Sequence, residues 1–205
     1  MLWLLVRARD RDTVAGDLHE EYLLEVLPAR GPIRARLWYW RQVASFVSPV
    51  MLGLAFGAVL GVANLIDTAY EPLSDDSAGA MLTYIAILVG VWTVAALAAG
   101  RRRQSFRDAI VAGVLVGGAT LAMCNLANYI RVNLFLDAIR DREDWRNLMA
   151  RYRESHVQSL RVFVNYDYLK ATVAVTSLGA AAGCVSGVVG GAINALMTWA
   201  SSPSR

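Results

Sequence analysis

Apolar residues fill four long stretches of this chain. Residues 44–66, 80–99, 109–130 and 171–199 contain no charged side chain. A helix needs about 20 mostly apolar residues to cross the roughly 30 Å hydrocarbon core of a bilayer, because only a helix satisfies its own backbone hydrogen bonds there. All four stretches are long enough. The pattern therefore predicts an all-α, polytopic membrane protein with four transmembrane helices.

The polar remainder of the chain is small. We expect a prefix segment at residues 1–43, a transmembrane domain at 44–205, and one long external loop at 131–170. Neither polar segment is large enough for a conventional enzyme domain. The net charge of +3 belongs to a chain that is 56% hydrophobic, with no solvated basic domain to grip nucleic acid. Membrane lipids are the first partners that the composition implies.

The placement of arginine predicts how the chain is oriented. Arginines gather before the first span and between the second and third, at Arg7, Arg9, Arg11, Arg30, Arg34, Arg36, Arg41, Arg101, Arg102, Arg103 and Arg107. The loop at 67–79 has no basic residue and four acidic ones. Short loops rich in Lys and Arg stay in the cytoplasm. We therefore expect both termini in the cytoplasm.

The prefix segment contains a helical pattern followed by an aromatic and basic one. Residues 12–27 repeat apolar side chains every fourth position, which predicts an amphipathic helix that ends near Pro28 and Gly31. Residues 33–43 then interleave arginines with aromatic rings, a combination typical of headgroup depth. This second part is either a membrane-surface collar or a docking site for a partner.

Glycine recurs every four residues in the first and last spans. The two series are Gly53, Gly57 and Gly61, followed by Asn64, and Gly179, Gly183, Gly187 and Gly191, followed by Asn194. Such a stripe removes side chains from one helix face and allows close helix packing. The two faces are expected to pack within the chain, with an intermolecular interface or a substrate path as alternatives. The third span repeats the theme weakly at Gly113 and Gly117.

The external loop is dense in charge, and residues 137–160 place Trp145, Leu148 and Tyr152 at helical spacing. We expect a helical hairpin here, or a helix that lies on the outer surface.

Sequence motifs for catalysis and metal binding are missing. The chain has no CxxC, HExxH, GxSxG or phosphate-binding glycine loop with lysine. Its two histidines, His19 and His156, would lie on opposite sides of the membrane. No Asp, Glu, Lys, Arg or His lies within a predicted span, whereas ion-coupled carriers usually place such a group at depth. We therefore expect no enzyme activity, no cofactor and no metal, and a carrier is weakly supported.

Residues 9–43 resemble the prefix domain that precedes MacB/FtsX-like ABC-type permeases in some bacteria. The resemblance rests on Gly16-Asp17-Leu18, on Glu20-Glu21, and on Trp38-Tyr39-Trp40-Arg41-Gln42 just before the first span. It implies a cytoplasmic module attached to an export-type permease of the bacterial inner membrane. The rest of the chain departs from that family, because the first loop is too short to hold the large external domain of such permeases.

Together these patterns favour a non-enzymatic accessory or regulatory subunit that binds another integral membrane protein, with an ABC-type permease as the implied partner. The expected contact residues are Asp17, Glu20, Glu21, Trp38, Tyr39, Trp40, Arg41 and Gln42. Two alternatives stay open. One is a structural subunit of a large respiratory or photosynthetic complex, and the other is a small self-assembling carrier or channel.

Overall fold

The computed structural model describes residues 19–45, 48–73 and 78–200, and these residues form helices and turns without a strand. Four helices are long and apolar enough to cross a membrane. They are α4 (Pro49–Tyr70), α5 (Ala78–Arg103), α6 (Phe106–Ile139) and α8 (Leu160–Ala200). The predicted all-α fold with four transmembrane helices is confirmed, and the chain is a multi-pass membrane protein.

The chain divides into two compact units, Met1–Met51 and Leu52–Arg205. The first contains a π-helix, η1 (Tyr22–Val26), followed by α3 (Leu27–Ser45). A sharp kink interrupts α3 at Gly31, where φ is 71° and ψ is 167°. This backbone conformation is open almost only to glycine, and the following proline has no N–H to continue the helix. Of the helix predicted over 12–27, residues 12–18 lie outside the described residues.

The kink turns the first unit into a helical hairpin. Val26 before the kink and Ala35 after it are both buried. The rings of Tyr22 and Tyr39 meet edge to face, with their centroids 5.5 Å apart. Both pairs lie at nearly equal distances from Gly31 along the chain, as antiparallel pairing requires. These four side chains therefore form the small core of the N-terminal unit.

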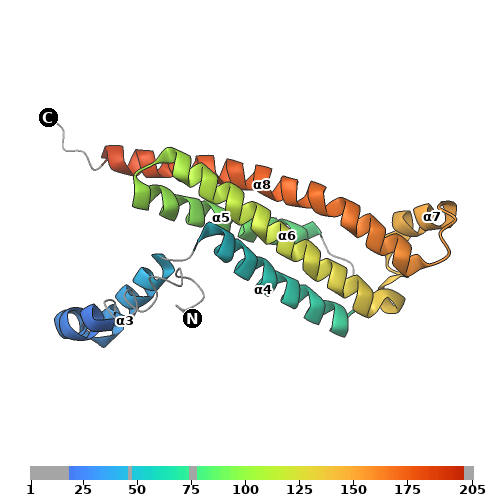
Figure 1. Cartoon of the computed structure of the whole chain (residues 1–205), viewed down its shortest axis with the longest axis horizontal. Coiled ribbons are helices and arrows are strands. Elements are labelled where there is room, and N and C mark those ends of the chain that lie inside the picture. The colour runs from blue at the N-terminus through green and yellow to red at the C-terminus, as the bar shows by residue number, and fades with distance from the viewer. Residues whose placement is uncertain (1–18, 46–47, 74–77, 201–205) are drawn as a thin grey trace. The chain divides into compact units, whose positions relative to one another are not determined.

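Helix α6 is the central helix of the second unit. The four long helices run up and down beside one another (Figure 1). Half of the most apolar window of α6 is buried, against 17% for α4 and for α5. Both α5 and α8 contact α6, and the buried glycines of α4 lie against it as well. α6 is therefore the most deeply buried of the four long helices.

Two helices extend well past the apolar spans that predict them. α6 ends at residue 139 rather than 130, and α8 begins at residue 160 rather than 171. Helical hydrogen bonds do not stop at the edge of the hydrocarbon, because polar residues can continue the same helix into water. Much of the segment expected as a 131–170 loop is therefore the ends of α6 and α8.

The connection between α6 and α8 holds two short helices, η2 (Glu143–Trp145) and α7 (Arg146–Glu154). The helical stretch expected over 137–160 is thus interrupted on both sides of this pair. The second interruption includes His156, which has a φ of 58°.

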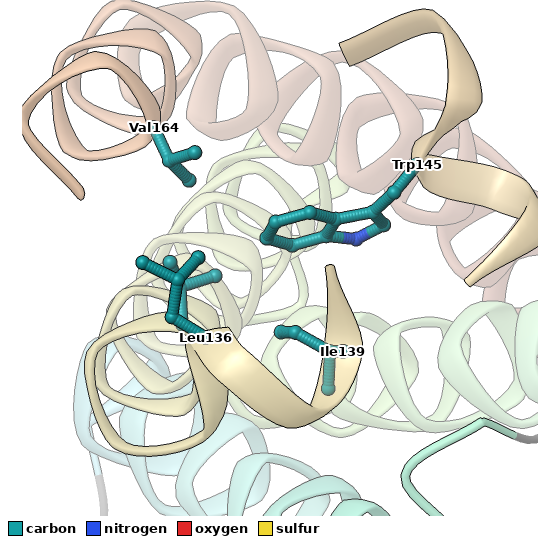
Figure 2. Close-up of a cluster of buried hydrophobic side chains, with 5 residues drawn as sticks. Leu136, Ile139, Trp145 and Val164 are labelled. Atoms are coloured by element: carbon teal, nitrogen blue, oxygen red, sulfur yellow. The ribbon is translucent and has the colours of Figure 1, made fainter. Parts of the chain in front are cut away.

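An apolar cluster holds this connection against the end of the bundle. Figure 2 shows the Trp145 ring pointing toward Leu136 and Ile139 of α6 and Val164 of α8. Trp145 is only 4% exposed. Burying one large ring among aliphatic side chains contributes a few kcal/mol. The cluster fixes η2 and α7 over the ends of α6 and α8, which is the end of the bundle that we call the α7 end.

Candidate functional site

The glycine face of α4 packs on α6. Gly53, Gly57 and Gly61 are all buried. A methyl group added at Gly57 would lie 2.5 Å from the carbonyl oxygen of Thr120, and one added at Gly53 would lie 2.5 Å from that of Val116. No atom fits at such a distance without a shift of the backbone. The stripe therefore lets α4 touch the main chain of α6. Asn64, one turn further on, is half-buried.

The glycine face of α8 packs on a different part of α6. A methyl group added at Gly179 would lie 2.5 Å from the carbonyl oxygen of Gly117, and one added at Gly187 would lie 2.6 Å from Cα of Ile110. Gly183 lies against Gly113 and Gly117. The weak repeat in the third span is therefore the surface that receives the strong repeat in the fourth.

The two glycine faces do not meet each other, because α6 lies against both. At the far end of the second face, Gly191 packs against the ring of Phe106, and Asn194 is half-buried. A substrate path along either stripe would need space that the neighbouring main chain already fills.

Polar contacts fix the helices around α6. The indole N–H of Trp92 in α5 donates to Oγ1 of Thr120 at 3.2 Å, and that hydroxyl donates to the carbonyl of Val116 at 2.7 Å. Nδ2 of Asn125 donates to Oγ1 of Thr172 in α8 at 2.7 Å. Hydrogen bonds of this kind orient helices in an apolar medium, where dispersion alone is weakly directional.

The residues expected to bind a partner lie in the N-terminal unit. Glu20 and Glu21 are exposed, Trp38 and Gln42 are half-buried, and Tyr39 contacts Tyr22. Asp17 and the side chains of Trp40 and Arg41 lie outside the described residues. The unit also has a groove of about 500 Å³ lined by Ala29, Arg30, Arg34, Leu37 and Trp38. It therefore presents acids at the start of its first helical segment, and arginines beside apolar groups on both sides of the kink.

A cavity of about 470 Å³ lies at the α7 end of the bundle. Its walls come from α5, α6, η2, α7 and α8. The lining residues are Tyr84, Leu121, Cys124, Asn125, Asn128, Arg131, Asp144, Trp145, Leu148, Asp167, Tyr168, Ala171 and Val175. We call this the Arg131 cavity, because Arg131 is the one basic residue among them.

Arg131 is buried without a visible counter-charge. Its exposed fraction is 9%, and its Nε has no hydrogen-bond partner in the part of the chain that the structure describes. The two carboxylates of the cavity are bound elsewhere. Asp144 accepts from Nε of Arg142 at 3.0 Å, and Asp167 accepts from both terminal nitrogens of Arg151 at 2.9 and 3.0 Å. The arrangement leaves one buried positive charge facing the cavity.

The sequence also carries a signal for this site, in addition to its hydropathy and glycine patterns. Asn125, Asn128 and Arg131 follow one another at intervals of three, which places them on the same side of α6. Arg131 is also the first charged residue after the apolar stretch 109–130. What the sequence cannot show is that η2 and α7 fold back over Arg131 and bury it.

Metal chemistry has no evident centre in the described ranges. Across residues 19–45, 48–73 and 78–200, no group of three or more His, Cys, Asp or Glu side chains could hold a metal ion. No family model, curated protein or solved structure matches this chain. Inference about function therefore starts from the geometry of the two units.

Proposed function

We propose that this chain is a non-enzymatic accessory or regulatory subunit that binds another integral membrane protein through its N-terminal unit. The observation that carries the proposal is the exposed apolar surface of that unit, which is compact in itself. Leu24, Ile33 and Leu37 are 68%, 76% and 67% exposed, although the segment precedes the first spanning helix. Apolar side chains of this size outside the spans favour contact with a protein or a membrane surface.

Charge next to these apolar side chains supports a specific partner surface. Arg34 and Arg36 are exposed on the second segment of the hairpin and Arg30 is exposed just before the kink, while Glu20 and Glu21 are exposed at the start of the first segment. Neighbouring patches of opposite sign select a partner and its orientation more than they add affinity. In our proposal, Asp17 and the Trp38–Gln42 segment belong to the same contact surface.

The glycine stripes are not available for docking a partner. Both are occupied by α6 inside the chain, which removes the most obvious helix surface for a membrane partner. The N-terminal hairpin then becomes the better docking surface. The resemblance of residues 9–43 to a permease prefix domain makes an ABC-type permease the proposed partner.

The proposed location is the bacterial inner membrane, with both termini in the cytoplasm. Arg101, Arg102 and Arg103 end α5, and Arg107 lies in the first turn of α6, just after the short connection. Positive charge on a short connection favours the cytoplasmic side. The N-terminal unit would then lie where a cytoplasmic ATPase or the inner face of a permease can reach it.

A mild-detergent purification of the tagged full chain, with stoichiometric partners identified by mass spectrometry, tests this proposal. A permease or ATPase of the ABC type is the expected partner. Redox subunits would overturn the proposal in favour of a structural subunit of a respiratory or photosynthetic complex. A pure homo-oligomer would overturn it in favour of a self-assembling carrier or channel.

A pair of matched variants assigns the contact surface. Leu37→Ala removes an apolar side chain that is 67% exposed in the N-terminal unit, and Leu134→Ala removes one that is 66% exposed on α6. We expect the Leu37 variant to lose the partner and the Leu134 variant to keep it. Equal retention by the two variants would mean that the N-terminal unit is not the docking surface.

A further inference from the structure

The buried guanidinium of Arg131 needs a compensating group. Removing a charge from water is unfavourable even after the surroundings relax, unless an opposite charge or hydrogen-bond acceptor replaces the lost hydration. Within the described residues, Nε of Arg131 has no such acceptor. The side chain nevertheless lines a cavity large enough for a ligand group. The surroundings of Arg131 are therefore those of a residue that pairs with the negative charge of a bound ligand.

The neighbouring carboxylates do not meet this need. Asp144 and Asp167 are paired with Arg142 and Arg151, and the second pair has the two-point geometry that guanidinium and carboxylate prefer. Arg131 is therefore the one guanidinium that lines the cavity, and neither lining carboxylate is within ion-pair distance of it. A guanidinium whose Nε has no acceptor favours an anion with several oxygen acceptors, such as a phosphate group.

The walls of the cavity change from apolar to polar along α6. Leu121 and Cys124 line one end, and Asn128 and Arg131 line the other, with Val175 of α8 beside the apolar part. Ten residues of helix separate Leu121 from Arg131, a rise of about 15 Å. Arg131 comes directly after the apolar stretch 109–130, so it lies at headgroup depth. A ligand that follows these walls has an anionic head and an apolar body.

We propose that the Arg131 cavity binds the phosphate group of an anionic ligand, with Arg131 as counter-ion and Asn128 as a neighbouring amide donor. The apolar wall favours a phospholipid from the surrounding membrane as the source of that group, and free phosphate is the alternative source. Basic pockets between transmembrane helices bind lipid headgroups by the same chemistry. This proposal is independent of the partner proposed for the N-terminal unit.

The test compares the full-length protein with two variants in a neutral detergent. Arg131→Gln removes the buried charge, and Arg161→Gln removes an exposed arginine near the start of α8 as a matched control. Phosphatidylglycerol, phosphatidylcholine and inorganic phosphate are titrated separately, and the melting temperature is followed. A ligand that binds only the folded state raises that temperature in proportion to its affinity.

We expect phosphatidylglycerol to raise the melting temperature of the wild type and of the Arg161 variant more than phosphatidylcholine does. Arg131→Gln should weaken this response by about tenfold or more, as the loss of a charged hydrogen bond does. Without lipid, the Arg131→Gln protein should melt at the same temperature as the wild type or higher, because its uncompensated charge is gone. That last result separates loss of a ligand from loss of the fold.

The remaining arms identify the source of the anion and keep the proposal open to refutation. If inorganic phosphate alone gives the full Arg131-dependent response, the site stands and its source is the free ion. Arg131→Lys should keep the preference for anionic ligand at reduced affinity, because it keeps the charge and loses the planar fork. An equal response to both lipids, or an anionic preference that survives Arg131→Gln, would overturn the proposal.

Discussion

Replacing Gly183 with alanine should force α6 and α8 apart. The added methyl group would lie 2.8 Å from the carbonyl carbon of Gly113 and 3.2 Å from Cα of Gly117. Non-bonded carbon atoms meet at about 3.5 to 4.0 Å, so the helices must separate by roughly 0.5 to 1 Å. The obstacle is main chain, which cannot rotate away as a side chain can.

The expected destabilisation is about 2 kcal/mol. Overpacking of a tight interface costs about 1 to 3 kcal/mol, and the upper end applies here because the methyl group meets the α6 main chain at both Gly113 and Gly117. Alanine also favours the helix over glycine by about 1 kcal/mol, which offsets part of the cost. Gly90→Ala is the matched control, because a methyl group there has no neighbour within 4 Å. That variant should keep the gain without the clash.

Equilibrium unfolding by SDS in mixed micelles, followed by tryptophan fluorescence, measures both variants. The free energy of unfolding should change in opposite directions in the two variants, with Gly183→Ala less stable than wild type and Gly90→Ala as stable or slightly more so. If both variants are stabilised, or if the Gly183 variant lies within about 0.5 kcal/mol of wild type, the main-chain contact between α6 and α8 is not tight.

Three further changes test other parts of the fold. Trp145→Ala should cost about 3 to 5 kcal/mol of stability, because it empties the centre of the apolar cluster. Limited proteolysis should then cut within residues 140–159, and an unchanged cleavage pattern would contradict the role of the cluster. Arg151→Lys loses one of the two hydrogen bonds to Asp167. Because both side chains are partly exposed, the loss of stability should stay below about 1 kcal/mol. A reduced salt dependence of thermal unfolding would measure it. Gly31→Ala should cost about 1 to 3 kcal/mol of stability, since φ of 71° with ψ of 167° strains any residue with a side chain. Near-UV circular dichroism should report the opened hairpin. An unaltered spectrum would argue against the kink.

The apolar pattern alone locates the four spanning helices, because each must supply its own span of uncharged residues. Their ends are less predictable. α6 continues for nine residues past residue 130, and α8 begins eleven residues before 171. Charged residues can sit on the water-exposed turns of the same helix, so a change in hydropathy locates the membrane boundary rather than the helix end.

The candidate sites depend on contacts between segments far apart in the chain. The glycine spacing predicts that two stripes pack closely, but their common neighbour α6 follows from how the helices are arranged in space. The stripe at Gly113 and Gly117 looks weak in sequence because it has only two glycines. In the structure these two glycines lie directly against the main chain of α8. The burial of Arg131 likewise depends on η2 and α7 folding over it.

Biosynthesis of this bundle depends on the order in which its helices enter the membrane. α6 is made before α8, so the face of Gly113 and Gly117 stands open to lipid or to the insertion machinery until α8 arrives. An assembly intermediate with only the first three spanning helices therefore exposes this face of α6, which chaperones and proteases can recognise. Pulse-chase labelling of a chain stopped at residue 159 would show this as a half-life shorter than that of the full chain. The packing of α8 on α6 is then the last step of assembly, and chains that complete it escape degradation.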